Sequence, residues 1–356
     1  MPRLRMFETV SPASATRLES FRDFAPNPGD LDTLTYIPAD LPARAPLVVV
    51  LHGCTQNAAV YDRGSGWSAL ADEHGFALLY AEQRRGNNPN GCFNWFEADD
   101  TTRGSGEAAS IAAVTTAVVT AHGLDSSRVF VTGLSAGGAM TAVMLATYPD
   151  ISAGGAVIAG LPYGLAHGVS EALSEMSRPA QRSGHSLGQP VRAATTFTGP
   201  WPRISVWHGD GDRTVAAANG DGVARQWVDV HGLSNAAPTV EQVGSQPVRR
   251  WRDTSGVAQV EAWAIPGIGH GTPIEAATGG AVGAHFLEAG IGSSAHIAAF
   301  WGVAPAVAAV AAVAAAKIDP RATVAPTPFR PAPRAGVVNS VSDTINSALR
   351  AAGLLS

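Results

Sequence analysis

The sequence predicts an α/β fold in which a mostly parallel central sheet is covered by helices on both faces. Short apolar runs alternate along the chain with longer segments of helical pattern, which is typical of such folds. The runs are continuous and rich in β-branched residues, as expected of strands that are buried on both faces. Glycine-rich turns with polar residues follow two of the later runs, so polar side chains are expected to meet at the carboxyl edge of the sheet.

The expected elements follow one another in the order that this fold requires. Residues 46–51 (PLVVVL) end at His52-Gly53 and indicate a buried central strand. The chain before them, around residues 33–37, is expected to form an antiparallel edge strand. The other expected strands are residues 76–80, 128–132, 156–159, 204–207 and 260–265, and the expected helices are residues 67–74, 107–122 and 294–301.

These elements are expected to form a single domain, residues 1–303. Residues 161–202 break the alternation and carry many Ser, Gly, Pro and Arg residues, so we expect an insertion over the carboxyl edge of the sheet, partly helical near 170–176. Residues 304–335 are rich in Ala, Val and Pro, which predicts a linker. Residues 336–356 place their apolar side chains on one face of a helix and predict a C-terminal amphipathic helix.

The composition favours a globular protein with few charges. The chain has 356 residues, of which 46% are hydrophobic and 15% charged, enough apolar material for a large core. The net charge of −5 and the absence of a Lys and Arg run argue against a nucleic-acid partner. No stretch is long and apolar enough to cross a membrane. The N-terminal residues 1–6 are not followed by an apolar segment, so a secretory signal peptide is not expected.

A candidate nucleophile lies between an expected strand and an expected helix. Residues 128–141 (RVFVTGLSAGGAMT) contain the pattern G-x-S-x-G around Ser135. A nucleophile elbow needs this setting, because its tight turn requires residues without bulk, such as Gly133 and Gly137. The other interpretation, a glycine-rich turn with an incidental serine, is disfavoured because partners for a catalytic serine follow in the expected chain order.

The partners expected of such a serine are an acid and then a histidine. The strand at 204–207 leads into HGDGDRTV, which contains Asp210 and Asp212, and the strand at 260–265 leads into PGIGHG, which contains His270. His270 would accept the Ser135 proton, and an aspartate would hold its tautomer. Asp210 and Asp212 compete for this role, and the residues alone do not separate them.

Further motifs lie along residues 30–303, and they are LHGCTQNA (51–58), GCFNWF (91–96), GLSAGGAM (133–140), AGLPYG (159–164), HGDGD (208–212), GIGHGTP (267–273) and HIAAFWG (296–302). With these motifs the chain resembles the poly(3-hydroxybutyrate) depolymerase family of esterases, which includes feruloyl and acetylxylan esterase relatives. The resemblance implies an α/β-hydrolase fold and a serine esterase that acts through a Ser-His-Asp triad and an acyl-enzyme. The family pattern HGxxDxxV matches His208, Gly209, Asp212 and Val215, which implies that Asp212 is the acid of the triad.

The resemblance also implies an oxyanion hole formed by the backbone N–H groups of Cys54 and Ala136. Cys54 and Cys92 both lie in loops past the carboxyl ends of neighbouring expected strands. We hypothesise that a disulfide joins them and braces the oxyanion loop. A disulfide suits an exported enzyme, as family members often are, whereas the N-terminus carries no signal, so the localisation is left open.

Aromatic residues give the clue to the substrate. Trp95 and Trp201 are expected to form an aromatic wall for an apolar acyl chain or a polyester strand. The first hypothesis is hydrolysis of short-chain polyhydroxyalkanoate esters, poly(3-hydroxybutyrate) or its oligomers. The alternatives are a feruloyl, acetylxylan or small-ester esterase, and a non-catalytic binding protein on the same scaffold. No metal and no cofactor is expected, because HExxH, paired histidines at ligand spacing and a nucleotide loop are absent from the sequence. The sequence leaves the oligomeric state open.

Overall fold

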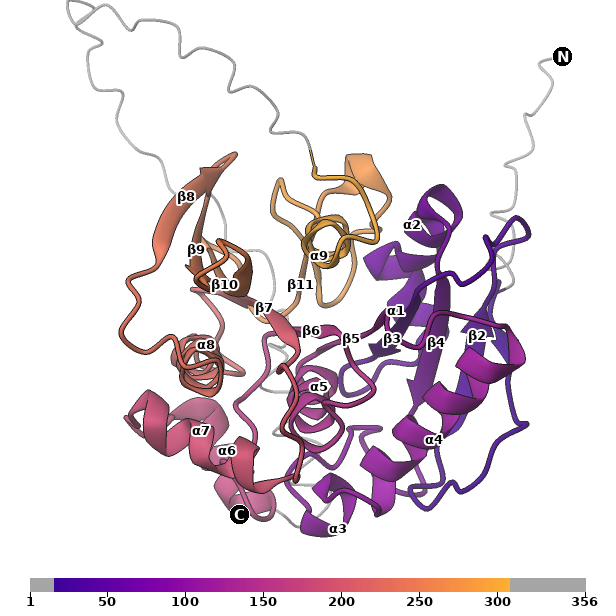
Figure 1. Ribbon diagram of the computed structural model, residues 1–356, viewed down its shortest axis with the longest axis horizontal. Coiled ribbons are helices and arrows are strands. Elements are labelled where there is room, and N and C mark those ends of the chain that lie inside the picture. The colour runs from indigo at the N-terminus through magenta and orange to yellow at the C-terminus, as the bar shows by residue number, and fades with distance from the viewer. Residues whose placement is uncertain (1–15, 308–356) are drawn as a thin grey trace, which may run out of the picture.

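The computed structural model describes residues 16–307 and confirms the α/β class (Figure 1). Its strands are β1 (Glu19–Ser20), β2 (Asp32–Tyr36), β3 (Leu47–Leu51), β4 (Ala77–Glu82), β5 (Val129–Leu134), β6 (Gly154–Ile158), β7 (Arg203–Gly209), β8 (Thr239–Val243), β9 (Gln246–Arg252), β10 (Ala258–Ile265), β11 (Thr272–Ile274) and β12 (Phe286–Glu288). A 10-stranded sheet runs in the order β1-β2-β4-β3-β5-β6-β7-β10-β9-β8. The strands from β4 to β10 in this order are parallel, and antiparallel strands extend the sheet at both ends. β11 and β12 pair separately.

Helices cover both faces of the sheet. They are α1 (Ala58–Ser65), α2 (Trp67–His74), α3 (Ala98–Thr101), α4 (Gly106–Ala121), α5 (Ala136–Thr147), α6 (Val169–Ser177), α7 (Gly184–Ala193), α8 (Ala218–Val230) and α9 (Ser293–Trp301), together with the short 3-10 helix η1 (Ala276–Thr278). Successive residues of a strand point to opposite faces, so Leu47 and Val49 belong to the core on the face covered by α4, α5 and α8, while Val48 and Val50 belong to the core on the face covered by α1, α2 and α9. Figure 1 shows these two helical layers on opposite sides of the sheet.

The structure differs from the sequence-based expectation at both ends of the sheet. β2 is antiparallel as predicted but it is not the edge, because β1 pairs outside it with Glu19 opposite Thr35. At the other end, the hairpin β8–β9 was not predicted, because most of its side chains are at least partly exposed and give no apolar run. The linker and the C-terminal helix expected at residues 304–335 and 336–356 lie outside the described residues, apart from residues 304–307.

The insertion at residues 161–202 covers the carboxyl edge of the sheet only with its first part. α6 docks on the loop after β7, where Ala216 N donates to the Met176 carbonyl oxygen at 2.7 Å. α7 instead packs along α8, and Gln226 Nε2 donates to the Leu187 carbonyl oxygen at 2.8 Å. Because β6 and β7 are parallel, the chain must then return to the opposite edge of the sheet before β7 begins.

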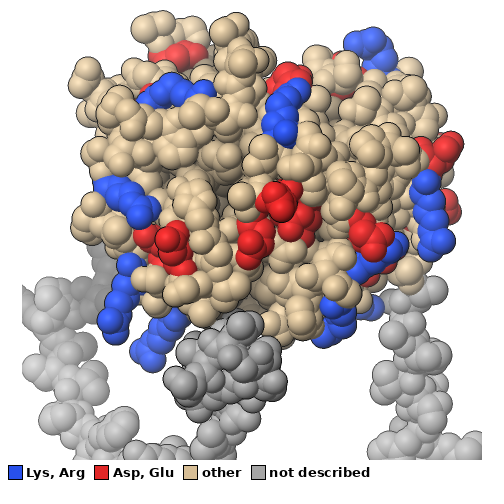
Figure 2. All heavy atoms as spheres, turned by 90° about the horizontal axis from the view of Figure 1, so that it is seen from below, with Lys and Arg blue, Asp and Glu red and all other residues tan. Residues whose placement is uncertain are grey.

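Charged side chains of both signs are interspersed on the face that carries α4 and α7 (Figure 2). Several of them form ion pairs between elements. Arg192 of α7 lies 2.5 Å from Asp229 of α8, and Arg103 binds Asp150 through two hydrogen bonds of 2.6 and 2.8 Å. Such exposed pairs each contribute little stability. Over residues 16–307, no helix combines the length and apolar character needed to cross a membrane.

The turn between β5 and α5 lies so close to the end of β3 that it requires glycine. A Cβ atom added at Gly137 would lie 2.3 Å from the carbonyl oxygen of Leu51 and 2.5 Å from that of His52. A Cβ atom at Gly133 would lie 2.4 Å from the carbonyl oxygen of Gly137. These contacts are with main-chain atoms, which cannot turn aside as a side chain can.

We therefore expect Gly137→Ala to lower the free energy of unfolding by at least about 1–3 kcal/mol, because the added methyl group forces β3 and α5 apart. Urea unfolding followed by circular dichroism measures the change. Gly86→Ala is the matched control, since nothing lies within 4 Å of a Cβ at that position. Equal unfolding midpoints for the two variants would contradict the expectation.

Candidate active site

Ser135 occupies the turn between β5 and α5 in a conformation that side chains rarely adopt. Its backbone dihedrals are φ 58° and ψ −117°, and such strain persists only where the surroundings enforce it. Ser135 N donates to the Ile158 carbonyl oxygen at 2.9 Å, and Ala139 N donates to the Ser135 carbonyl oxygen at 2.8 Å. The turn therefore has the geometry that the elbow prediction requires, with Ser135 at the carboxyl end of β5.

Asp212 and His270 lie on the loops that follow the neighbouring parallel strands β7 and β10. Nδ1 of His270 lies 2.7 Å from Oδ2 of Asp212. Asp210 does not contact the histidine but accepts a hydrogen bond from Gly267 N at 2.7 Å, and so holds the loop that carries His270. The geometry thus separates the two aspartates that the residue pattern left in competition, and it pairs Asp212 with His270.

The surroundings of Asp212 keep it ionised. Burial alone raises the pKa of this carboxyl group, but the neighbouring His208 and His270 rings outweigh burial and hold the pKa well below its usual range. The other oxygen, Oδ1, accepts backbone hydrogen bonds from Thr214 N at 2.8 Å and Val215 N at 2.9 Å. A carboxylate fixed in this way selects the Nδ1–H tautomer of His270 and leaves Nε2 free to act as a base.

Ser135, Asp212 and His270 stand at one edge of the sheet, because β5, β7 and β10 are parallel and end there. The side chain of His270 is 8% exposed, and Ser135 is 9% exposed. Within residues 16–307, the Ser135 hydroxyl and the His270 ring share no hydrogen bond. Contacts of this kind often form only when a substrate is bound.

The loop after β3 presents a free backbone N–H group at Cys54. Gly53 N donates to Oε1 of Gln56, Thr55 N to the Asn90 carbonyl oxygen and Gln56 N to the Gly53 carbonyl oxygen. Among the described residues, neither Cys54 N nor Ala136 N has an acceptor. Ala136 is the first residue of α5, where the positive end of the helix dipole also favours an anion. Both expected oxyanion donors are thus available.

A disulfide between Cys54 and Cys92, whose Cα atoms lie 4.3 Å apart, ties this loop to the segment after β4. Gln83 connects the same two segments, since its Nε2 donates to the Cys92 carbonyl oxygen at 3.1 Å and also binds Glu107. Glu107 is 1% exposed and accepts from Asn94 N at 2.9 Å. Burial, with a smaller effect of Asp100, raises the pKa of Glu107 to about 8. A buried polar network therefore underlies the loop after β3.

His52 joins that network to the loop itself. Its ring is 1% exposed, Nδ1 lies 2.8 Å from the Gly53 carbonyl oxygen, and Nε2 accepts from Gln83 N at 3.1 Å. These partners require a proton on Nδ1 and none on Nε2, so the ring is neutral. Burial is the main reason that the pKa of His52 falls to about 4, although the hydrogen bond to Gly53 opposes the shift.

The two tryptophans expected to line the site lie in different places. Trp95 packs against a small apolar cluster formed by Ala139, Leu161 and Val215, and Val215 is also a backbone donor to Asp212. Trp201 precedes the amino end of β7, at the opposite edge of the sheet from Ser135, and its ring packs on Trp227 of α8. The structure therefore brings Trp95 to the candidate site, and the expectation for Trp201 is wrong. The reason is that the insertion returns to the amino edge of the sheet before β7 begins, and Trp201 lies at that end of the insertion.

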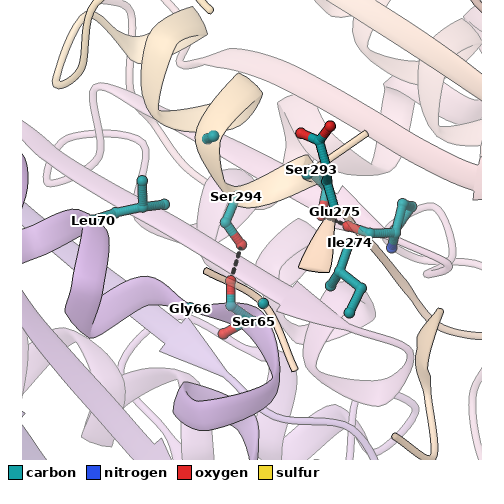
Figure 3. Close-up of a pocket in the computed structure, with 11 residues that line it drawn as sticks. Ser65, Gly66, Leu70, Ile274, Glu275, Ser293 and Ser294 are labelled. Atoms are coloured by element: carbon teal, nitrogen blue, oxygen red, sulfur yellow. Dashed lines mark hydrogen bonds between the residues drawn. The ribbon is translucent and has the colours of Figure 1, made fainter. Parts of the chain in front are cut away.

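One further pocket is separate from these groups. Residues of α1, α2, the β11 strand and the start of α9 line it, and Figure 3 shows Ser294 Oγ donating to the Ser65 carbonyl oxygen across it. None of the expected site residues contributes to this pocket. In the part of the chain that the structure describes, no group of three or more His, Cys, Asp or Glu residues could hold a metal ion.

Several polar residues around the site were not singled out from the sequence. His208 lies at the end of β7 and contacts Asp212, and His285 places Nδ1 3.2 Å from the His270 carbonyl oxygen. Gln83 and Glu107 pair across 24 positions. His208 could have been found from the HGxxD motif, whereas the sequence carries no local signal for the other three.

Comparisons with known proteins identify the family to which the chain is similar. A family model described as Esterase PHB depolymerase matches residues 32–245. Poly(3-hydroxyalkanoate) depolymerase C of Paucimonas lemoignei is 44% identical over 299 residues, which cover 83% of this chain and 72% of that protein. Acetylxylan esterase A of Aspergillus oryzae is 31% identical over 270 residues, which cover 73% of this chain and 86% of that protein. The solved acetyl xylan esterase from Aspergillus awamori superposes with a TM-score of 0.66 at 27% identity, covering 71% of this chain and 93% of that chain.

The lowered pKa of His52 predicts a pH dependence of stability. Because the pKa is about 4 in the folded state and 6.5 as a model value, His52 contributes stability that is present above pH 6.5 and is lost as the pH falls toward 4. The loss amounts to about 3 kcal/mol. We expect His52→Gln to show a correspondingly shallower fall of the unfolding free energy between pH 6.5 and 4.

Urea unfolding at a series of pH values measures this difference. His122→Gln, at an exposed histidine, is the control and should follow the wild type. If His52→Gln also follows the wild type at every pH, the neutral buried ring is ruled out.

Proposed function

The chain belongs to the PHB depolymerase family of esterases, and from this premise we propose that it is a serine esterase of polyhydroxyalkanoates, acting on poly(3-hydroxybutyrate) or its oligomers. As a member it is a carboxylic ester hydrolase. The observation that carries the proposed mechanism is the His270–Asp212 pair beside the strained turn of Ser135, at one edge of the sheet. The substrate proposal rests on the relative named as a poly(3-hydroxyalkanoate) depolymerase, the most similar of those compared above.

In the proposed reaction, Nε2 of His270 takes the hydroxyl proton of Ser135 while Oγ attacks the ester carbonyl carbon. The carbonyl oxygen becomes an oxyanion, which accepts hydrogen bonds from Cys54 N and Ala136 N. When the intermediate collapses, the ester C–O bond breaks and the leaving alcohol takes the proton from His270. Water then attacks the acyl-Ser135 ester with His270 again as the base, and the second collapse releases the acid and returns the proton to Ser135.

The environment of each group suits its proposed role. Asp212 stays ionised through its hydrogen bonds and therefore stabilises the imidazolium that forms at His270. The oxyanion donors belong to two rigid segments, one braced by the disulfide and His52 and the other fixed at the start of α5. Donors that are already in place need no reorganisation during the reaction, which is the main source of their catalytic effect.

The apolar cluster beside the acid supports an apolar acyl group. Ala139, Leu161 and Val215 are buried, and Trp95 and Met176 pack against them from the solvent side. A 3-hydroxybutyrate unit presents a methyl group and a methylene group between its ester bonds, and such groups gain binding energy from an apolar wall. We propose that Trp95 forms this wall.

Acetyl esters on a polysaccharide are the second candidate substrate. The acetylxylan esterases share the fold and 31% identity with this chain, and the superposition with the Aspergillus awamori structure includes most of that enzyme. The depolymerase interpretation is preferred because its relative is 44% identical.

We expect the wild-type protein to release soluble 3-hydroxybutyrate from an amorphous poly(3-hydroxybutyrate) suspension. Ser135→Ala should lose this activity by roughly 10⁴-fold or more, because the nucleophile is removed. Released monomer and oligomers are measured by chromatography, with acetylated xylan and a nitrophenyl butyrate as parallel substrates. Release of acetate from xylan without release from the polyester would move the assignment to the second candidate. Equal activity of Ser135→Ala on every substrate would overturn the nucleophile.

We expect Trp95→Ala to lower kcat/KM for a nitrophenyl butyrate by roughly 10-fold and for the acetate by less, because the shorter acyl group loses fewer apolar contacts. Trp201→Ala is the matched control. It removes the same side chain at the opposite edge of the sheet, so it should keep the wild-type butyrate-to-acetate ratio even if stability falls. A wild-type ratio in Trp95→Ala would show that the acyl group does not contact this wall.

A further inference from the structure

Asp212 contacts a second histidine besides His270. Nε2 of His208, the penultimate residue of β7, lies 3.4 Å from Oδ2 of Asp212, the same oxygen that His270 binds at 2.7 Å. The His208 side chain is 6% exposed and the Asp212 side chain is 0% exposed, so water does not compete for this contact. The carboxylate therefore faces two imidazole rings on one oxygen and two backbone N–H groups on the other.

The hydrogen bonds of His208 define its tautomer. Nε2 lies 2.9 Å from the Val215 carbonyl oxygen, and a carbonyl oxygen can only accept, so Nε2 carries the proton. Nδ1 is buried without a hydrogen-bond partner among the described residues, so a second proton placed there would have no acceptor. The N–H group at Nε2 donates to the Val215 carbonyl oxygen, and Nε2 also lies 3.4 Å from Oδ2 of Asp212, close enough to favour the ionised carboxylate.

His208 also fixes the turn that follows the acid. Val215 N donates to Oδ1 of Asp212, and Val215 O accepts from His208, so the ring closes a loop from the end of β7 through the acid to Val215. Gly220 of α8 packs on the other side of the ring, where an added Cβ atom would lie 2.8 Å from Nδ1. The ring is therefore held from both sides.

From this arrangement we infer that His208 is a positioning residue of the catalytic site, which orients Asp212 and disperses its charge. The inference rests on the proposed triad and adds a residue to it. Without this N–H group, Asp212 would carry more of its charge toward His270, and the turn through Val215 that holds Oδ1 of Asp212 would lose a support. The added charge would stabilise the protonated form of His270 before the substrate is attacked. The loss of support would misplace Asp212 and with it His270.

Both effects give distinct kinetic signatures. The titratable groups that contact His270 are Asp212 and His285, whose ring centroid lies 5.9 Å from that of His270. Asp210 lies nearby and holds the His270 loop through Gly267 N. These remain in place when His208 is replaced. The acid limb is the part of the plot of kcat/KM against pH in which activity falls as His270 becomes protonated. Loss of the His208 N–H group should therefore move this limb to higher pH, whereas a purely structural role of His208 would lower activity without moving it.

The test compares two replacements of His208 on a soluble nitrophenyl butyrate. His208→Phe keeps the ring but removes the N–H group, and it should lower kcat by roughly 10- to 100-fold with little change in KM. Its acid limb should move up by roughly 0.5 to 1 pH unit. His208→Gln places an amide N–H group where Nε2 lies and should restore most of kcat and the wild-type limb. His231→Phe is the control, since His231 is partly buried and also binds a carbonyl oxygen, that of Pro202 at 3.1 Å, but far from the site.

The inference is overturned if His208→Phe keeps the wild-type kcat and limb, if His208→Gln is no better than His208→Phe, or if His231→Phe moves the limb equally. If His208→Phe does not fold, Gly220→Ala tests the same point, because its methyl group displaces the His208 ring. This variant should move the acid limb in the same direction. An acid limb that stays in place would then overturn the inference. Ser135→Ala and Asp212→Asn, assayed alongside, separate this outcome from failure of the triad. If both of them retain activity, the proposed triad itself is wrong.

Discussion

The arrangement of the candidate site depends on one close contact, that of the β5–α5 turn with the end of β3. Gly137 lies so near the carbonyl oxygens of Leu51 and His52 that no side chain fits between them. Because β3 and β5 are neighbours in register, this contact places the strained Ser135 next to the loop that carries Cys54. The proposed nucleophile and one proposed oxyanion donor are therefore positioned by the same packing constraint. The proposed donor at Ala136 follows from it as the first residue of α5.

Two buried polar assemblies extend from this contact in opposite directions along the sheet. On one side, His52, Gln83 and Glu107 hold the loop that carries the proposed oxyanion donor Cys54, with the Cys54–Cys92 disulfide as a covalent link. On the other side, Asp212 accepts a hydrogen bond from His270 and lies 3.4 Å from Nε2 of His208. The two carboxylates respond differently to burial. Asp212 gathers enough donors to hold its pKa low, whereas Glu107, next to the negative Asp100, has a pKa raised to about 8. Only the first is suited to remain a permanent charge beside a catalytic base.

The sequence predicts those parts of the site that depend on local pattern. The strand-turn-helix context identifies Ser135, and the position of His270 after a late strand identifies the candidate base, since carboxyl ends of parallel strands meet at one edge. The choice of Asp212 over Asp210 needed a family resemblance, because both residues follow the same strand. Trp201 was misplaced because composition does not reveal that the insertion crosses back to the amino edge before β7. The pairing of Gln83 with Glu107 and of β8 with β9 arises from tertiary packing, for which the local sequence has no periodic signal.

Val215 connects the proposed acyl wall with the proposed acid. Its N–H group binds Asp212, its carbonyl oxygen binds His208, and its side chain is 0% exposed within the cluster that Trp95 covers. On the proposed assignment, an acyl group that packs against the cluster of Val215 also acts on the turn that orients Asp212. Binding energy from the acyl chain would then be expressed partly in the alignment of Asp212 and His270, and so in kcat as well as in KM. An esterase built in this way discriminates between acyl groups in the transition state, which is where a difference of one methylene group has the most effect on rate.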